Sequence, residues 1–153
     1  MDKTQFKAFC KKEFEARGFK RQKNIFYLSG RDVLCGIVLQ KSNYGEIYYI
    51  NYYFFIGEFR SINNYPTHYE SDVYGRILAM SKTSTIRGEH FVTAQIEYKE
   101  YTEEELRPYF DKAFEEKILP PIQQGKKYIL ENLGKLYSTP LNKEEVMQKL
   151  ITE

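Results

Sequence analysis

Six residues carry the polar and aromatic chemistry best suited to binding a ligand or a partner. They are Gln40, Ser42, Tyr49, Asn51, Tyr53 and Arg76. Their amide and hydroxyl groups donate and accept hydrogen bonds, tyrosine rings supply flat contact area, and a guanidinium can hold an anionic group. The same polar groups could instead satisfy a buried turn or a helix end packed on a sheet, because buried polar groups usually have internal partners. The sequence leaves both interpretations open.

A second group of residues has the types that bind metal ions. The segment His68-Tyr69-Glu70-Ser71-Asp72 places three such side chains at alternate positions, and His90 lies further along the chain. An extended segment would point the three the same way, but no second pair completes a recognisable site. We therefore expect a solvated loop here, and we expect neither a metal nor another cofactor.

The sequence contains no recognisable catalytic motif. Cys10 and Cys35 fall in hydrophobic stretches, where we expect buried free thiols. A nucleophilic cysteine needs a nearby histidine and a lowered thiol pKa, and neither context indicates one. Nucleophilic-serine motifs, phosphate-binding glycine loops and dinucleotide fingerprints are also missing from the sequence. We therefore name no catalytic residue, and the sequence favours a protein that is not an enzyme without excluding one.

A basic segment near the amino terminus offers contact with phosphates. Its cations are Lys11, Lys12, Arg17, Lys20, Arg21 and Lys23, and its neighbouring rings are Phe26 and Tyr27. Such rings could stack on bases while the cations meet the backbone. The net charge of the whole chain is only +2, and the region from Glu97 to Lys117 is acidic. Nucleic-acid binding is therefore the least favoured function that we consider.

The elements that must position the six candidate residues begin with a long hairpin. Residues 33–55 read as two strands joined by the turn Asn43-Tyr44-Gly45-Glu46. If Ser42 opposes Ile47, the pairs on one side of the sheet are Gln40 with Tyr49, Val38 with Asn51 and Gly36 with Tyr53. A ring from Tyr53 would then cover Gly36. The other side carries Cys35, Ile37, Leu39, Ile50, Tyr52 and Phe54, which form an aliphatic and aromatic core.

The remaining segments predict helices around this sheet. Apolar spacing indicates a helix from Lys3 to Arg17 that ends at Gly18, a short strand over 25–28, and an alternating strand over 91–98 with Val92 inward. Residues 58–89 have a weak pattern, so we expect an irregular segment in which only residues 74–80 have enough apolar content for a buried element. A helix beginning near Pro108 and ending at Pro120-Pro121 should follow, then one opened by Pro121 and a last one capped by Asn142.

The order of these elements predicts an α+β fold. An N-terminal helix precedes a central antiparallel β-sheet built on the long hairpin, and C-terminal helices pack on that sheet. At 153 residues the chain is long enough for one domain, which we place at 1–153. Its apolar runs are much shorter than the roughly 20 residues that a membrane helix needs. We therefore expect a soluble cytoplasmic protein that does not bind membranes.

Several segments together resemble a known family. In chain order they are Gly18-Phe19-Lys20-Arg21, Phe26-Tyr27, Val38-Leu39-Gln40-Lys41-Ser42, Phe55-Ile56-Gly57 and Arg76-Ile77. This series is similar to the bacterial family called domain of unknown function 4304, over roughly the first half of the chain. The family often has a tryptophan pair after the Arg-Ile position, and this chain has no Trp. Because the family has no established activity, the resemblance implies a fold and a bacterial cytoplasmic setting only.

Three functions follow from these observations, in order of preference. The first is a small binding or interaction module that uses the tyrosine-rich sheet face and the irregular segment 58–89, most suitably for a protein partner. The second is a small-molecule binder or enzyme whose pocket lies between that face and Arg76. The third is weak nucleic-acid binding. The sequence does not indicate an oligomeric state.

Overall fold

The centre of the fold is an antiparallel sheet of five strands in the order β1-β2-β3-β4-β5. In this computed structural model, residues 1–139 and 143–152 are described. The strands of this sheet are β1 (Lys20–Gln22), β2 (Ile25–Ser29), β3 (Val33–Lys41), β4 (Tyr48–Ile56) and β5 (Val73–Arg76). Because every neighbouring pair is antiparallel and β2 to β4 follow one another directly, hairpins build most of the sheet. The predicted α+β class, with helices before and after an antiparallel sheet, is confirmed.

The pairing register of the long hairpin is the one that the alternation predicts. Gln40 pairs with Tyr49, Val38 with Asn51 and Gly36 with Tyr53. The prediction that the Tyr53 ring covers Gly36 is not what the structure shows. The nearest ring belongs to Tyr27, on the neighbouring strand β2. A Cβ atom at Gly36 would lie 3.3 Å from the Tyr27 Cε1 atom.

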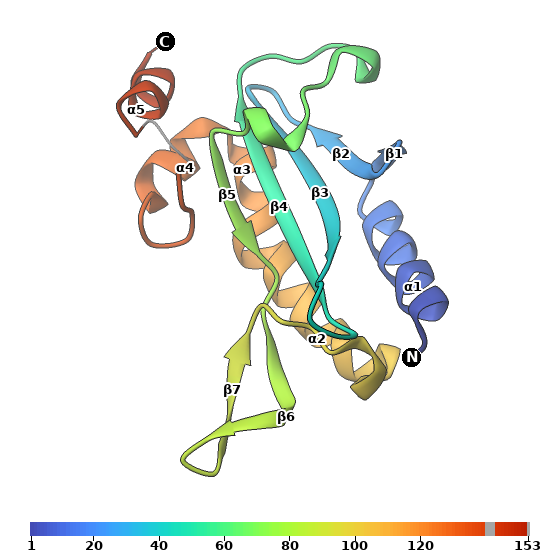
Figure 1. Cartoon of the computed structure of the whole chain (residues 1–153). Helices are drawn as coiled ribbons and strands as arrows, with labels where there is room; N and C mark the ends of the chain where they lie inside the picture. Colours follow the sequence, from blue (N-terminus) through green and yellow to red (C-terminus); the bar gives the residue numbers. More distant parts are fainter. Residues whose placement is uncertain (140–142, 153) are drawn as a thin grey trace.

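Helices cover one face of the sheet (Figure 1). The α-helices are α1 (Lys3–Ala16), α2 (Glu103–Ala113), α3 (Leu119–Gln124), α4 (Lys126–Asn132) and α5 (Lys143–Ile151). Phenylalanines join α1 and α2 to the sheet: the Phe14 ring lies 6.0 Å from Phe110 and 5.2 Å from Phe26, measured between centroids. Cys35, Ile37 and the other expected core residues of β3 and β4 lie in this layer. The predicted aliphatic and aromatic core is therefore on the helix-covered face.

In the described parts of the chain, no α-helix covers the opposite face of the sheet (Figure 1). Residues 57–72 instead fold across one end of it and contain the short 3₁₀ turns Ile62–Asn64 and His68–Glu70. Their side chains pack on a second, smaller core. This core contains Ile25, Tyr27, Leu34, Val38 and Phe55, with Tyr53, Phe59, Ile62 and Tyr65 against it. Only part of the tyrosine-rich face is therefore covered.

The expectation of an irregular segment over residues 58–89 is wrong for its second half, apart from the buried element expected at residues 74–80. That half contains β5 and the first strand of a separate hairpin, formed by β6 (Ala79–Ile86) and β7 (Glu89–Thr93), which extends away from the main sheet. The predicted strand over 91–98 consequently ends at Thr93, and Val92 is 54% exposed instead of inward. Most side chains of this hairpin contact solvent, so burial imposes no alternating pattern on its sequence.

Two helix boundaries differ from those that the prolines predict. α2 begins at Glu103, because Thr102 and Glu105 form a reciprocal capping box, and Pro108 lies inside the helix. The chain then widens into a π-helical turn (Phe114–Ile118) and stays helical through Pro120. α1 ends as expected, with Gly18 at a φ of +95°. The predicted cap at Asn142 lies outside the described residues.

Candidate functional site

A hydrogen-bonded chain of side chains crosses the tyrosine-rich face. The buried Asn51 amide donates to Gln40 Oε1 at 2.8 Å and accepts from Arg76 Nε at 2.8 Å. Strand pairing explains this arrangement, since Asn51 faces Arg76 on β5 and lies diagonally from Gln40 on β3. For Asn51, the interpretation that buried polar groups have internal partners is therefore correct.

Arg76 is fixed by an aromatic ring as well as by Asn51. The centre of its guanidinium lies 4.4 Å from the centroid of the Tyr49 ring, which is within the range of a cation–π contact. Only Nε of this guanidinium takes part in a hydrogen bond with the described residues. The two terminal nitrogens of Arg76 therefore form no hydrogen bond or ion pair in the described part of the chain.

An open hollow of about 490 Å³ lies beside this chain of side chains. It is lined by Val38, Leu39, Gln40, Asn51, Tyr53, His68 and Tyr69. The rings form a row: Tyr53 and His68 have centroids 5.3 Å apart, and His68 and Tyr69 have centroids 4.0 Å apart. The outermost ring, Tyr69, is 85% exposed. This row presents one continuous aromatic surface to solvent.

The imidazole of His68 has an unused polar atom. Its Nδ1 atom is buried and has no hydrogen-bond partner among the described residues. Such atoms are uncommon because an unsatisfied buried polar group costs about 1–3 kcal/mol. His68 Nδ1 is therefore an unsatisfied buried atom beside the row of rings.

The structure brings together five of the six residues predicted from the sequence. Gln40, Asn51 and Tyr53 line the hollow, and Tyr49 and Arg76 lie next to it through Asn51. Ser42 is separate, because its hydroxyl accepts from the Tyr44 backbone N–H at 3.1 Å within the hairpin turn. We call Gln40, Tyr49, Asn51, Tyr53, His68, Tyr69 and Arg76 the tyrosine face.

Sequence reasoning assigned the segment 58–89 to the contact surface but did not single out His68 and Tyr69. Both belong to the covering segment, and their place depends on how residues 57–72 fold back over the sheet. Because no second pair of metal-binding residues completes a site with this segment, the sequence indicated a solvated loop instead. Among the described residues, no group of three His, Cys, Asp or Glu side chains could hold a metal ion. The other histidine, His90, lies on the distant β6–β7 hairpin.

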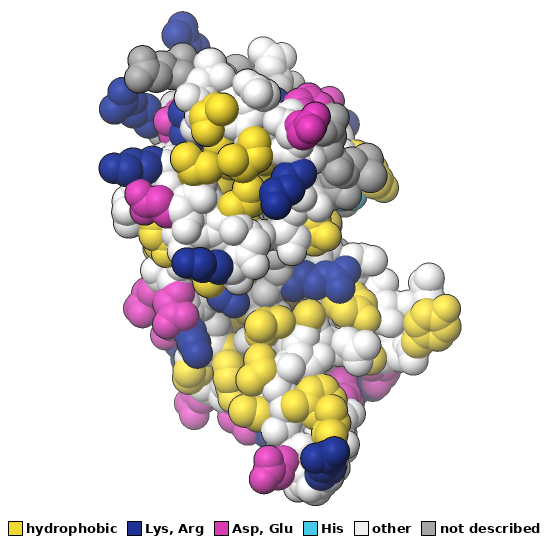
Figure 2. Space-filling model, turned by 90° about the vertical axis from the view of Figure 1, so that its left-hand side faces the viewer, with side chains coloured by type: hydrophobic (Ala, Val, Ile, Leu, Met, Phe, Trp, Pro, Cys, Tyr) yellow, Lys and Arg dark blue, Asp and Glu magenta, His cyan; other side chains and the backbone are white. Residues whose placement is uncertain are grey.

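Tyr53 and Arg76 line two different hollows of the described structure. Arg76 lines a different hollow of about 110 Å³ at the base of the β6–β7 hairpin, together with Leu78, Val92, Tyr109, Lys112, Ala113 and Lys117. Figure 2 views this side of the molecule and shows apolar side chains gathered with Lys and Arg side chains among them. The small hollow is too narrow for most ligands, since typical pockets exceed about 300 Å³.

The titration behaviour of the site and of the thiols follows from burial. Partial burial raises the pKa of the Tyr53 phenol, and the positive charge of Arg76 offsets part of that rise. Burial likewise raises the thiol pKa of Cys10 and Cys35 well above its ordinary value. Both are free and buried, as predicted from their hydrophobic contexts. At neutral pH these thiols stay protonated, which is unfavourable for nucleophilic attack.

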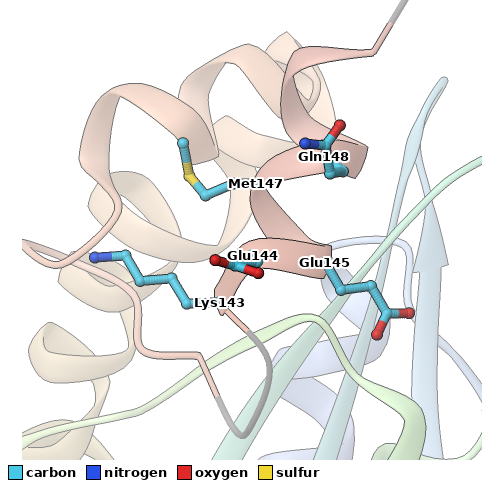
Figure 3. A pocket seen from close by; sticks show the side chains of 5 residues that line it. All are labelled: Lys143, Glu144, Glu145, Met147 and Gln148. Atoms are coloured by element: carbon cyan, nitrogen blue, oxygen red, sulfur yellow. The ribbon is translucent and has the colours of Figure 1, made fainter.

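A larger hollow, of about 770 Å³, lies along α5 but has a different character. The residues that line it are Lys143, Glu144, Glu145, Met147 and Gln148. All five come from one helix, and their side chains spread to different sides of it instead of converging (Figure 3). We assign no site to this depression.

Residues 10–124 match the family described as Domain of unknown function (DUF4304). The chain belongs to this family. The match includes β1 to β5, the β6–β7 hairpin and the helices up to α3, so it extends beyond the first half of the chain to which the sequence resemblance pointed. All seven residues of the tyrosine face lie within the matched part. Neither a curated protein nor a solved structure matches the chain. In the described parts of the chain, no helix is long and apolar enough to cross a membrane.

Proposed function

We propose that this protein is a binding module whose tyrosine face contacts a segment of a partner protein. We place it in the cytoplasm of a bacterium, on the basis of the family resemblance. The observation that carries the proposal is the state of Arg76. Its guanidinium is fixed by Tyr49 and Asn51, while its terminal nitrogens have no partner in the described chain. A group held in this way is ready to receive a carboxylate at little further entropic cost.

The surface around Arg76 indicates the chemistry of the partner. Tyr53, His68 and Tyr69 provide a row of rings with little side-chain freedom, and such rings are favoured where proteins meet. Gln40 is exposed and has hydrogen-bonding capacity beyond its bond to Asn51. The partner segment should therefore carry an Asp or Glu at Arg76 and an apolar or aromatic side chain against the ring row.

The geometry favours a protein partner over the small-molecule alternative. A pocket for an anionic ligand between the tyrosine-rich face and Arg76 would place Tyr53 and Arg76 in one cavity. In the described chain they line different hollows, and the one beside Tyr53 is open to solvent. An open aromatic surface supports contact with a chain segment more than enclosure of a small molecule.

Affinity capture with matched variants tests this proposal. The wild-type chain is used as bait in a lysate of its native host, beside Arg76→Glu and the control Arg60→Glu. Arg60 is also exposed, and its only ion pair is a 3.6 Å contact with Glu58 within the described residues. We expect a protein captured at fixed stoichiometry by the wild type and by Arg60→Glu, and lost with Arg76→Glu. Equal capture by all three baits would contradict the proposal, as would capture by none.

A further inference from the structure

Another hollow, which is lined by none of the seven residues of the tyrosine face, concentrates positive charge. It has a volume of about 420 Å³ and lies between α1 and the sheet strands β1 to β4. Five of its lining residues are cations, namely Lys3, Lys7, Lys11, Arg21 and Lys41. No Asp or Glu lines it in the described chain. We call it the cationic hollow.

Local structure explains why these charges converge. Lys3, Lys7 and Lys11 are four residues apart on α1, so the helix places them in one row. Arg21 comes from β1 and Lys41 from the end of β3, on the sheet side of the same hollow. Three separate elements therefore deliver cations to one place.

Aromatic rings hold part of this charge in position. The Arg21 guanidinium lies 5.8 Å from the centroid of Phe26. The ammonium groups of Lys7 and Lys41 each lie 5.9 Å from the centroid of the same ring, Tyr48. Two like charges near one ring repel each other, and an anion between them would relieve that repulsion. Lys7 and Lys41 thus line the same hollow and lie near the same ring.

Most of these cations lack an internal counter-charge. Lys11 lies 3.7 Å from Glu15, and both side chains are well exposed, so this pair is weak. Lys3, Lys7, Arg21 and Lys41 form no ion pair with any described residue. Arg21 and Lys41 donate only to backbone oxygens, those of Lys23, Ser42 and Gly45.

This cluster differs from the basic segment that the sequence indicates. Arg17 does not contribute, because it pairs with Asp111 at 2.5 Å and with Glu13 at 3.6 Å. Tyr27 lies in the core of the opposite face and donates to the Pro66 oxygen. Lys41 and the lysines at positions 3 and 7 are instead brought in by the fold.

We infer that the cationic hollow binds a compact ligand that carries several neighbouring phosphate groups. Its volume lies within the usual range for small-ligand sites, about 300–1,000 Å³. Phe26 and Tyr48 are only 6% and 3% exposed, so they leave little ring surface on which a base could stack. The protein should therefore recognise the phosphate groups of the ligand. Lys7 and Lys41 would each contact a phosphate, and Arg21 would bind one in a bidentate manner.

A bounded hollow favours a small polyphosphate over a nucleic-acid strand. Nucleic-acid-binding proteins usually align cations along a track that follows many phosphates. Here the five cations surround one site, and the chain as a whole has a net charge of only +2.

Calorimetric titration with inorganic tripolyphosphate tests the inference. The double variant Lys7→Ala, Lys41→Ala should bind at least roughly tenfold more weakly than the wild type, because two charge-assisted contacts are lost. The control Lys12→Ala, Lys127→Ala removes the same charge from exposed lysines outside the hollow, and its affinity should stay within about twofold. Circular dichroism of both variants checks that they fold.

Two further ligands identify the source of the phosphates. Equal affinity for ATP and tripolyphosphate would support recognition of phosphates alone, and tighter binding of ATP would support a nucleotide. The inference is overturned if tripolyphosphate does not bind, or if both double variants lose affinity equally. It is also overturned if a single-stranded oligonucleotide binds more tightly than either small ligand at equal salt.

Discussion

The Arg76 guanidinium lies 4.4 Å from the centroid of the Tyr49 ring, across neighbouring strands of the sheet. The contact occurs because Arg76 pairs with Asn51 and is therefore diagonal to Tyr49 on the same face. Asn51 completes the arrangement by accepting from Arg76 Nε. The arrangement of the tyrosine face thus follows from the strand register. A substitution that removes the Asn51 side chain should therefore alter it.

Asn51→Ala should lower the free energy of unfolding by about 1–2 kcal/mol, because it removes two hydrogen bonds of a buried side chain. The same change should release Arg76 from its fixed position. Urea denaturation measures the first effect. Gln40→Ala is the comparison, since it removes only one of these bonds from an exposed residue and should cost less. A smaller loss for Asn51→Ala than for Gln40→Ala would contradict the described network.

Gly75→Ala should destabilise the protein by about 2 kcal/mol, because β5 passes directly over the Tyr52 ring. A Cβ atom at position 75 would lie 2.5 Å from Tyr52 Cε2, and Tyr52 is 1% exposed and cannot move freely. Thermal or urea unfolding measures the loss. In a Tyr52→Leu background the added cost of Gly75→Ala should shrink, as expected for a coupled pair. Full additivity of the two changes would show that no such contact exists.

Stability should fall when the pH rises from about 10 to about 12, with Tyr101 as one cause. Burial is the main reason that its phenol pKa is raised to about 12, and Tyr109, Glu97 and Glu105 add to the rise. An unfolded tyrosine titrates near 10. Between these values the unfolded chain releases its proton first, so the stability present below pH 10 is lost as the pH rises toward 12.

Tyr101→Phe removes the titrating group and should make this fall less steep. Urea unfolding at several pH values between 8 and 11.5 measures the slope for both chains. Tyr44→Phe provides the matched control, because it removes a phenol that is 96% exposed. Identical slopes for Tyr101→Phe and the wild type would contradict the assignment. Tyr101 also donates to the Met80 oxygen, so the comparison concerns the slope and not the stability at pH 8.

The hairpin could be predicted because burial on both sides imposes a pattern on its sequence. One side of β3 and β4 faces the helices, and the alternation of Cys35, Ile37 and Leu39 with their neighbours identifies that side. This alternation also placed Gln40, Asn51 and Tyr53 together, as the structure does. Most of the site's sheet residues were therefore within reach of sequence reasoning.

The parts that escaped prediction have three separate causes: exposure to solvent, contact between distant segments, and a misjudged helix start. The β6–β7 hairpin is mostly exposed to solvent, so its sequence has no regular row of core-facing residues. Val92 is apolar but exposed, so it falsely indicates a buried position. His68 and Tyr69 belong to the site because residues 57–72 fold back on the sheet. No local sequence pattern predicts this folding back. Pro108 suggested a helix start, but the capping box at Thr102 and Glu105 is the signal that determines it.

Site-specific photo-crosslinking tests the proposed function most directly. A photoreactive phenylalanine derivative is placed at position 69 in one chain and at position 44 in another. Tyr69 and Tyr44 are matched as the two most exposed tyrosines of the described residues, at 85% and 96%, but only Tyr69 belongs to the tyrosine face. We predict a covalent adduct with one partner protein from position 69, abolished by Arg76→Glu, and none with that protein from position 44. Equal crosslinking from both positions, or an adduct from position 44 alone, would contradict the account.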